Sequence, residues 1–340
     1  MIYFRNDYSL GAHPQVLDAL IKTNMEHADG YGNDTFSQET AAMIRQLIGK
    51  PDAHVHFMVG GTPSNTITIA AALRPYEGVI SADTGHIYVH ETGSVEATGH
   101  RIFAVATEEG KLQPQDIEQV LLLHEDEHTV IPRLVYISLP TENGGIYTRE
   151  ELLALRQCCL RNNLYLYIDG ARLGTALTCE RADFTLRDVA DLCDAFYIGG
   201  TKLGAMFGEA LILLEPQIQH NFRYMIKRHL GLLAKGRLIS IQMKALLDGG
   251  EDSLYYCLGR QENQLAMKLA QGIAGAGYHF WIPPCTNQLF VILPDPLVEE
   301  LEENFFFHRW KKYDERRTVV RLVIGWGSTE EDVSAFLKAL

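Results

Sequence analysis

Short apolar segments recur along the first two thirds of the chain, and each of them ends in a polar or glycine-rich turn. These hydrophobic runs predict strands at Val55–Val59, Arg133–Leu139, Leu164–Ile168 and Ala195–Ile198. The amphipathic stretches between them predict helices at Ser64–Leu73, with Thr62 or Ser64 at its N-cap, and at Arg149–Arg161. Strands that alternate with helices predict an α/β fold, in which helices cover both faces of a mostly parallel sheet.

The last quarter of the chain has a different order of elements and predicts a smaller α+β unit. Its pattern indicates three strands, at Tyr278–Pro283, Gln288–Leu293 and Thr318–Ile324, and two helices, at Gln261–Ala274 and Thr329–Leu340. Helical spacing from about Glu215 to Leu247 predicts a bridge to this unit. We therefore expect an N-terminal arm (1–14), a large cofactor-binding domain that includes the bridge (15–247) and a small C-terminal domain (248–340).

Apolar and polar positions alternate in the last predicted strand. Val320, Leu322 and Ile324 share one face of that strand, so Arg321 points to the opposite face. An arginine in such a place is either a solvated strand residue or a ligand for a carboxylate, because its planar fork matches a carboxylate with two hydrogen bonds.

Three polar turns follow predicted strands, and the carboxyl ends of strands are where open α/β sheets bind ligands. These turns are Gly60-Gly61-Thr62, Asp169-Gly170-Ala171-Arg172 and Gly199-Gly200-Thr201-Lys202. The first opens a helix and can present backbone N–H groups to a phosphate, the second places a carboxylate in nearly dry surroundings, and the third carries an amine. Each feature alone has an ordinary explanation as a cap, a turn or a solvated side chain. Together they favour pyridoxal phosphate, which needs a lysine and an acidic partner for its ring nitrogen.

Composition and charge exclude several other classes of protein. With 46% hydrophobic and 21% charged residues, the 340-residue chain is typical of a globular protein and not of a disordered chain or a coiled coil. The formal net charge of −13 disfavours binding to nucleic acid or to an anionic membrane. No apolar run approaches the ~20 residues of a membrane span. The N-terminus has no apolar export signal, and the six cysteines form no CxxC pair, so we expect a cytoplasmic protein with reduced thiols.

Motifs along nearly the whole chain resemble the threonine aldolase and β-eliminating lyase group of fold-type I pyridoxal-phosphate enzymes. The motifs run from FRNDYSLGAHP to RLVIGWGSTEEDV and include YGND, GGTPSNT, HIYVHETG, PTENGG, YIDGARL and GGTKLGA. The most specific feature is DGAR, which the lysine turn follows about 30 residues later. The resemblance implies an aspartate aminotransferase-like large domain.

The resemblance implies roles for five residues around the cofactor. Lys202 would form the Schiff base, and Asp169 would hold the protonated ring nitrogen. Gly61 and Thr62 would bind the phosphate. His86 would stack on the ring.

The resemblance also implies a set of residues for an amino-acid substrate. Arg172 and Arg321 would bind its carboxylate, and Tyr31 and Glu91 stand in motifs that line the pocket. Asn6 stands where the family has a serine that contacts the substrate.

A second departure from the better-known threonine aldolases lies before Gly144. Where those enzymes have Glu-Asn-Thr-His, this chain reads Ser138-Leu139-Pro140-Thr141-Glu142. The chain therefore resembles a side branch, whose preferred substrate need not be threonine.

The resemblance implies that the active site lies between subunits of a homodimer or homotetramer. Lys235 falls in the segment that reaches the cofactor phosphate of the neighbouring subunit in the family. The aromatic run Phe305–Phe307 is predicted to be core or interface, and together with the helical bridge it offers apolar surface to a second copy.

The activity implied is a retro-aldol cleavage. A carbon–carbon lyase of this kind splits a β-hydroxy-α-amino acid, such as L-threonine or L-allo-threonine, into glycine and an aldehyde. His86 is the candidate base for the β-hydroxyl proton, because an imidazole titrates near neutrality; the alternative is that it only stacks on the cofactor.

Two alternative functions remain open, and a third, a zinc protease, is disfavoured. The same fold supports β-elimination or transamination, and a relative could bind ligands without catalysis. His124–His128 matches the HExxH pattern of zinc proteases, but both variable positions are acidic and the next residues, through Pro132, end any helix. We therefore predict a solvated loop there and expect no metal.

Overall fold

The computed structural model describes all 340 residues, which form a seven-stranded sheet and a smaller four-stranded sheet. The large sheet has the order β2 (His54–Met58), β8 (Glu209–Leu213), β7 (Ala195–Gly199), β6 (Tyr165–Asp169), β5 (Ile131–Ser138), β3 (Glu77–Ala82) and β4 (Ile102–Val105). Only β8 pairs antiparallel with its neighbours. The predicted mostly parallel sheet is therefore confirmed.

Helices cover both faces of this sheet, because residues of each strand alternate between two cores. Ile168 and Phe196 belong to one core, whereas Tyr167 and Tyr197 belong to the other. The first face packs against α1 (Pro14–Thr23), α2 (Thr35–Ile48), α5 (Pro114–Leu122), α6 (Arg149–Arg161), α7 (Leu173–Thr178), α8 (Leu186–Asp191) and α11 (Arg237–Leu247). The second packs against α3 (Gly61–Ala72), α4 (His86–Val89), α9 (Pro216–Gln219) and α10 (Phe222–Arg228).

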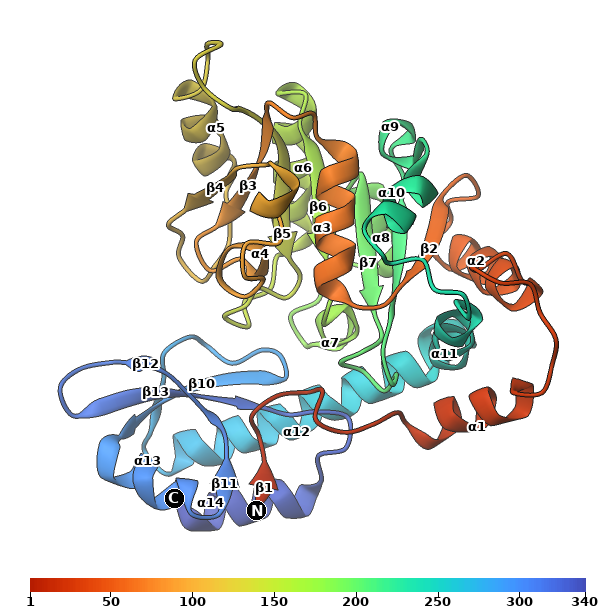
Figure 1. Cartoon of the computed structure of the whole chain (residues 1–340). Coiled ribbons are helices and arrows are strands. Elements are labelled where there is room, and N and C mark those ends of the chain that lie inside the picture. The colour runs from red at the N-terminus through yellow and green to blue at the C-terminus, as the bar shows by residue number, and fades with distance from the viewer.

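The small sheet lies beside the large unit, and α12 runs between the two (Figure 1). Its strands are antiparallel in the order β12 (His308–Lys312), β13 (Arg317–Val323), β10 (Gln288–Pro294) and β9 (His279–Phe280). One face packs against α12 (Leu254–Gly275), α13 (Asp295–Glu302) and α14 (Glu330–Ala339). None of the helices of the chain is long and apolar enough to cross a bilayer.

Three predicted elements differ from those observed. The strand expected at Tyr278–Pro283 is shorter and covers His279–Phe280, and the helix expected at Gln261–Ala274 is the middle of the longer α12. The bridge from Glu215 to Leu247 is broken into α9, α10 and α11, because Asn221 and Leu230 adopt left-handed backbone conformations between them.

The first residues of the chain, up to Phe4, pack with the small sheet unit. Ile2 and Tyr3 form β1, which pairs in parallel with β11 (Phe305–Phe306). Phe305 and Phe307 are buried in the same core as Phe4. Phe305 and Phe307 are therefore core, and only the half-buried Phe306 leaves apolar surface at this run.

The predicted alternation in β13 is confirmed. Val320, Leu322 and Ile324 lie in the core beneath the helices of the small unit. Arg321 lies on the opposite face, with Phe290 of β10 directly across from it. The small sheet therefore has an apolar face that packs on helices and a second face that carries this arginine.

Two glycines set the geometry at the strand ends. The N-cap of α3 is Gly60 and not Thr62 or Ser64, and no side chain caps the helix; Ser64 instead donates its hydroxyl hydrogen to the Gly60 carbonyl. The first N–H groups of α3 are therefore available to an external anion. A Cβ on Gly170 would lie 1.9 Å from the Tyr197 carbonyl oxygen, so only glycine permits this approach of β6 and β7.

We expect Gly170→Ala to destabilise the protein by about 2 kcal/mol or more, because the added carbon collides with backbone that cannot rotate away. Gly275→Ala is the matched control: nothing lies within 4 Å of its added carbon, and alanine favours a helix. Thermal unfolding of both variants measures the difference. Equal midpoints for the two would contradict the close approach at Gly170.

Candidate active site

The candidate site lies where adjacent strands of the large sheet end. Asp169 is the last residue of β6, in register with Ser138 at the end of β5. Lys202 follows the end of β7, the other neighbour of β6. The turn after β2 leads to Gly61 at the start of α3. The fold therefore brings together the three turns that the sequence singles out.

Asp169 is buried and accepts four hydrogen bonds. Its Oδ1 accepts from the Tyr197 hydroxyl at 2.5 Å and from the Ala171 N–H at 3.0 Å. Its Oδ2 accepts from the Tyr136 hydroxyl at 2.6 Å and from the Asn65 amide at 2.9 Å. A carboxylate has about four acceptor positions. One of these donors therefore has to turn away if a pyridinium N–H is to bind.

Sequence reasoning missed these donors. Tyr136, Tyr167 and Tyr197 lie on the same face of three adjacent strands, and the repeated tyrosine is a signal that could have found them. Asn65 stands inside the GGTPSNT motif and accepts a hydrogen bond from the Tyr167 hydroxyl at 3.0 Å. Their hydroxyl and amide groups offset the cost of burying a carboxylate.

A chain of hydrogen bonds joins Asp169 to His86. Asn65 donates to Asp169 and also to Glu91 Oε1, at 2.7 Å. The His86 Nδ1–H donates to the same Glu91 oxygen at 2.8 Å. Burial would raise the pKa of Asp169, but the His86 charge and the hydroxyl donors hold it below its ordinary value. Burial lowers the pKa of His86, but Glu91 and the charge of Glu142 outweigh it and raise that pKa.

The Lys202 turn is held by a buried acid. Glu209 accepts from the Gly200 N–H at 2.6 Å and from the Thr201 hydroxyl at 2.7 Å. Burial raises the pKa of Glu209 to about 7. Burial and the charge of Arg172 lower the pKa of the Lys202 ammonium, which favours the neutral amine needed for covalent chemistry.

These groups fit pyridoxal phosphate. The uncapped N-terminus of α3 suits a phosphate, and a Cβ on Gly61 would lie 2.8 Å from the Tyr197 hydroxyl, so the glycine keeps this corner open. Lys202 supplies an amine of lowered pKa, and Asp169 supplies an ionised carboxylate beside it. The space between α3, β6 and the Lys202 turn therefore has groups that suit the phosphate, the ring nitrogen and the covalent attachment of this cofactor.

The two arginines of the site are held differently. The Arg172 Nε and Nη2 donate to the Asp7 carboxylate at 2.6 and 3.1 Å, and Asn287 donates to the same carboxylate at 3.1 Å. Arg321 has no carboxylate partner: its Nε is buried without an acceptor, and its Nη2 lies 3.5 Å from the Arg5 carbonyl. Arg172 therefore has only Nη1 fully free, whereas Arg321 keeps most of its donors.

Glu142 and Asn6, which stand where this chain departs from the motifs of the family, lie near the two arginines. Glu142 is buried in the loop after β5 and accepts no hydrogen bond, and its charge acts on Arg172, Arg321 and Lys202. Asn6 lies next to Asp7, and its side-chain oxygen accepts from the Tyr8 N–H and the Ser9 hydroxyl. The Asn6 side chain is thus engaged by its own turn, whereas the Glu142 side chain has no hydrogen-bond partner.

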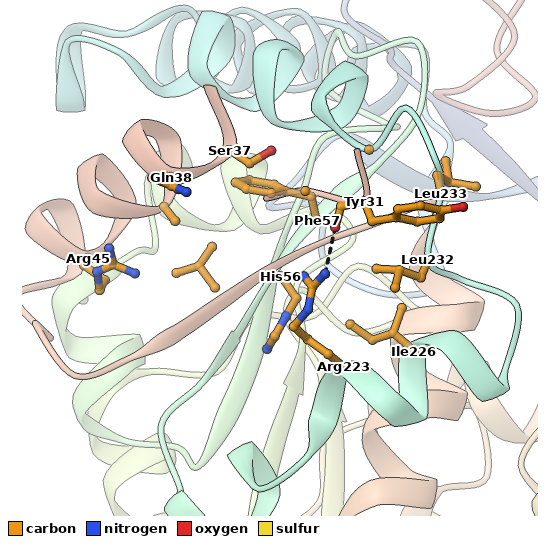
Figure 2. Close-up of a pocket in the computed structure, with 14 residues that line it drawn as sticks. Tyr31, Ser37, Gln38, Arg45, His56, Phe57, Arg223, Ile226, Leu232 and Leu233 are labelled. Atoms are coloured by element: carbon orange, nitrogen blue, oxygen red, sulfur yellow. Dashed lines mark hydrogen bonds between the residues drawn. The ribbon is translucent and has the colours of Figure 1, made fainter. Parts of the chain in front are cut away.

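Tyr31 and Lys235 form a separate group. Tyr31 lines a pocket of about 360 Å³ together with Arg223, whose Nη2 donates to the Tyr31 carbonyl at 2.9 Å (Figure 2). The Tyr31 N–H donates to the carbonyl of Ala234, the residue before Lys235. None of the residues around Asp169 and Lys202 lines this pocket. Within one chain, the two residues therefore lie apart from the cofactor site.

The HExxH segment is not helical. Helix α5 ends at Leu122, and His124–His128 follows it in turns and bends. The His124 ring packs on Phe103, with 4.5 Å between ring centroids. The predicted loop is therefore confirmed.

Comparisons with known proteins show the family and the fold of the chain. The family model described as β-eliminating lyase matches residues 4–295. The low-specificity L-threonine aldolase of Pseudomonas aeruginosa is 30% identical over 305 residues, which are 88% of this chain and 86% of that protein. A solved structure of threonine aldolase from Leishmania major is 42% identical, with a TM-score of 0.97 over 99% of this chain and 98% of the other. An aspartate aminotransferase from Thermus thermophilus, 15% identical, shares the fold, with a TM-score of 0.74 over 100% of this chain and 90% of that chain.

The fold and the site define a pyridoxal-phosphate-dependent enzyme of the aspartate aminotransferase-like architecture. More specifically, the chain belongs to the β-eliminating lyase family. The family, the fold and the cofactor expected from the sequence are confirmed.

We expect Glu91→Gln to move the acidic limb of the pH profile of kcat/KM to lower pH. Glu91 raises the pKa of His86, so its neutralisation lowers that pKa. A base must be neutral, and the fraction of neutral His86 would then rise at lower pH. Glu96→Gln, on an exposed turn nearby, is the control. An unmoved limb would indicate that His86 only stacks.

Proposed function

We propose that the protein cleaves the Cα–Cβ bond of a β-hydroxy-α-amino acid, such as L-threonine or L-allo-threonine, to give glycine and an aldehyde. The observation that carries this proposal is the meeting of three groups that follow β7, β6 and β3: an amine of lowered pKa, an ionised carboxylate and a histidine paired with Glu91. The names of the similar proteins from Pseudomonas aeruginosa and Leishmania major support the substrate class.

Lys202, Asp169 and the start of α3 would hold the cofactor. Lys202 is the point of covalent attachment, the N–H groups of Gly61 and Thr62 bind the phosphate, and Asp169 binds the ring nitrogen. When bound, pyridoxal phosphate supplies an electron sink for the bond that breaks at Cα. The low pKa of Asp169 keeps this carboxylate ionised, so it stabilises a protonated ring nitrogen.

Arg321 binds the substrate carboxylate, and the free Nη1 of Arg172 assists it. The Asp7 carboxylate fixes the plane of the Arg172 guanidinium, because two parallel hydrogen bonds allow only one orientation. A fixed carboxylate limits the rotation of the substrate about its Cα. The arginines thereby decide which bond of Cα is presented for cleavage.

His86 accepts the proton of the β-hydroxyl group. Its Nδ1–H is held by Glu91, so Nε2 is the nitrogen left to accept a proton. As the proton leaves the hydroxyl oxygen, the carbonyl of the aldehyde forms and the Cα–Cβ bond breaks. Glu91 stabilises the imidazolium that results.

We expect Lys202→Ala to remove turnover and the yellow absorption band of the bound cofactor, while the protein still folds. Lys338→Ala, at the end of α14, is the control and should keep both. Incubation of the parent with L-threonine and with L-allo-threonine should release glycine and acetaldehyde in equal amounts. Release of a 2-oxo acid with ammonia would indicate β-elimination, and a 2-oxo acid without ammonia would indicate transamination. A variant that keeps the band after dialysis would place the cofactor on another lysine.

We propose further that the protein is at least a homodimer, in which Tyr31 and Lys235 serve the site of the neighbouring subunit. Both lie outside the Lys202 cluster in their own chain, and apolar side chains around them are exposed, among them Leu230 at 88% and Tyr224 at 77%. Apolar surface of this kind is typical of subunit interfaces.

We expect light scattering to give a mass of two or four chains. Mixtures of inactive Lys202→Ala and Lys235→Ala proteins should regain activity after subunit exchange, to about a quarter of the parent, because a mixed C2 dimer has one intact site. Either variant mixed with itself is the control. An active species of one chain mass would contradict the proposal, and absence of rescue would place Lys235 in its own subunit's site. A Lys235→Ala protein that is active by itself would place Lys235 outside the mechanism.

A further inference from the structure

An aromatic ring, and not an anion, lies against the guanidinium of Arg321. The Arg321 Cζ is 5.1 Å from the centre of the Trp310 ring. Arg172, by contrast, is held by an anion, because two of its N–H groups donate to the Asp7 carboxylate. A π face attracts a cation without accepting its N–H hydrogens. Arg321 is therefore held while most of its N–H donors stay free, since the only protein acceptor near them is the Arg5 carbonyl, 3.5 Å from Nη2.

The Trp310 indole is itself fixed by three other rings. Phe290, His308 and His90 meet it at large interplanar angles of 73°, 70° and 62°, with centroids 5.3, 5.8 and 6.4 Å away. Edge-to-face contacts of this kind are favourable and directional. The rings come from β10, β12 and the end of α4, so both sheet units contribute to the position of the indole.

The strand register explains why these groups share one face. Phe290 on β10 and His308 on β12 are the direct partners of Arg321 on β13. The pairing of β12 with β13 is irregular between Arg309 and Lys311, so Trp310 stands at a bulge. A bulge re-aims the side chain that it carries. Here that side chain turns over the guanidinium of Arg321.

We propose that Trp310 is a positioning residue, which holds the Arg321 guanidinium by stacking so that its N–H donors remain free for the substrate carboxylate. This inference rests on the carboxylate-binding role of Arg321 in the proposed function. The buried Arg321 Nε, which has no acceptor in the protein, is one donor available for that purpose. A protein carboxylate in place of the indole would compete with the substrate for the same donors.

Trp310→Leu tests this role, because it removes the π face and keeps an apolar side chain. We expect the affinity for glycine, measured by calorimetry on the cofactor-loaded protein, to fall about tenfold or more. Binding of methylamine, which has an amine but no carboxylate, should stay within about threefold. In turnover, KM for L-threonine should rise while kcat changes little, because Trp310 does not touch the reacting atoms.

Two further variants serve as controls. Trp281→Leu removes an indole from the same sheet face whose partner is Lys311, at 3.5 Å, and it should bind glycine like the parent. Trp310→Phe retains a ring and should recover most of the lost affinity. The unfolding midpoint and the cofactor band reveal whether the leucine variant folds. If it does not, Trp310→Phe still tests the proposal.

Arg321→Met separates this inference from the function on which it rests. If Arg321→Met binds glycine like the parent, the carboxylate role of Arg321 is wrong and the proposal for Trp310 has no basis. If Arg321→Met loses affinity but Trp310→Leu does not, only the proposal for Trp310 is overturned. In the double variant, Trp310→Leu should add less than about threefold to the loss from Arg321→Met. A multiplicative loss would indicate a general structural effect.

Discussion

The buried, ionised carboxylate of Asp169 is the group around which the active site is organised. A bare carboxylate in a dry sheet would be costly, so the fold surrounds it with donors from both neighbouring strands and from α3. Tyr136 and Tyr197 come from β5 and β7, and Asn65 extends the network to Glu91. The same hydrogen bonds thus keep a negative charge at the centre of the sheet and link it to the histidine of the site.

The two arginines of the candidate site are held in two different ways. Asp7 orients Arg172 but uses two of its donors, and it ties the N-terminal arm to the large sheet unit. Arg321 belongs to the small sheet unit and is held by the ring of Trp310. The substrate carboxylate would therefore contact both units, and its binding would depend on how the small sheet sits against the large one.

Local patterns were sufficient for the layout of the fold. The apolar runs placed β5, β6 and β7, and the alternation in β13 placed Arg321 opposite the core, because period and burial are properties of neighbouring residues. Two local boundaries were wrong: the bridge is broken at left-handed residues, and Gly60 is the cap of α3. For the run Phe305–Phe307 the sequence left core and interface open, and the structure shows Phe305 and Phe307 in the core because they meet Phe4 from the other end of the chain.

The sequence by itself determined the family, the cofactor and the three turns of the site, because strand ends, glycines and charged residues are visible in their order along the chain. Only the tertiary structure decided the partners of those residues. The donors on Asp169 and the ring over Arg321 come from segments far apart in the sequence, and no local pattern encodes which side chains will meet. The tertiary structure also showed that Tyr31 lies apart from Lys202 within one chain. This separation depends on how whole elements pack and not on the motifs that contain the two residues.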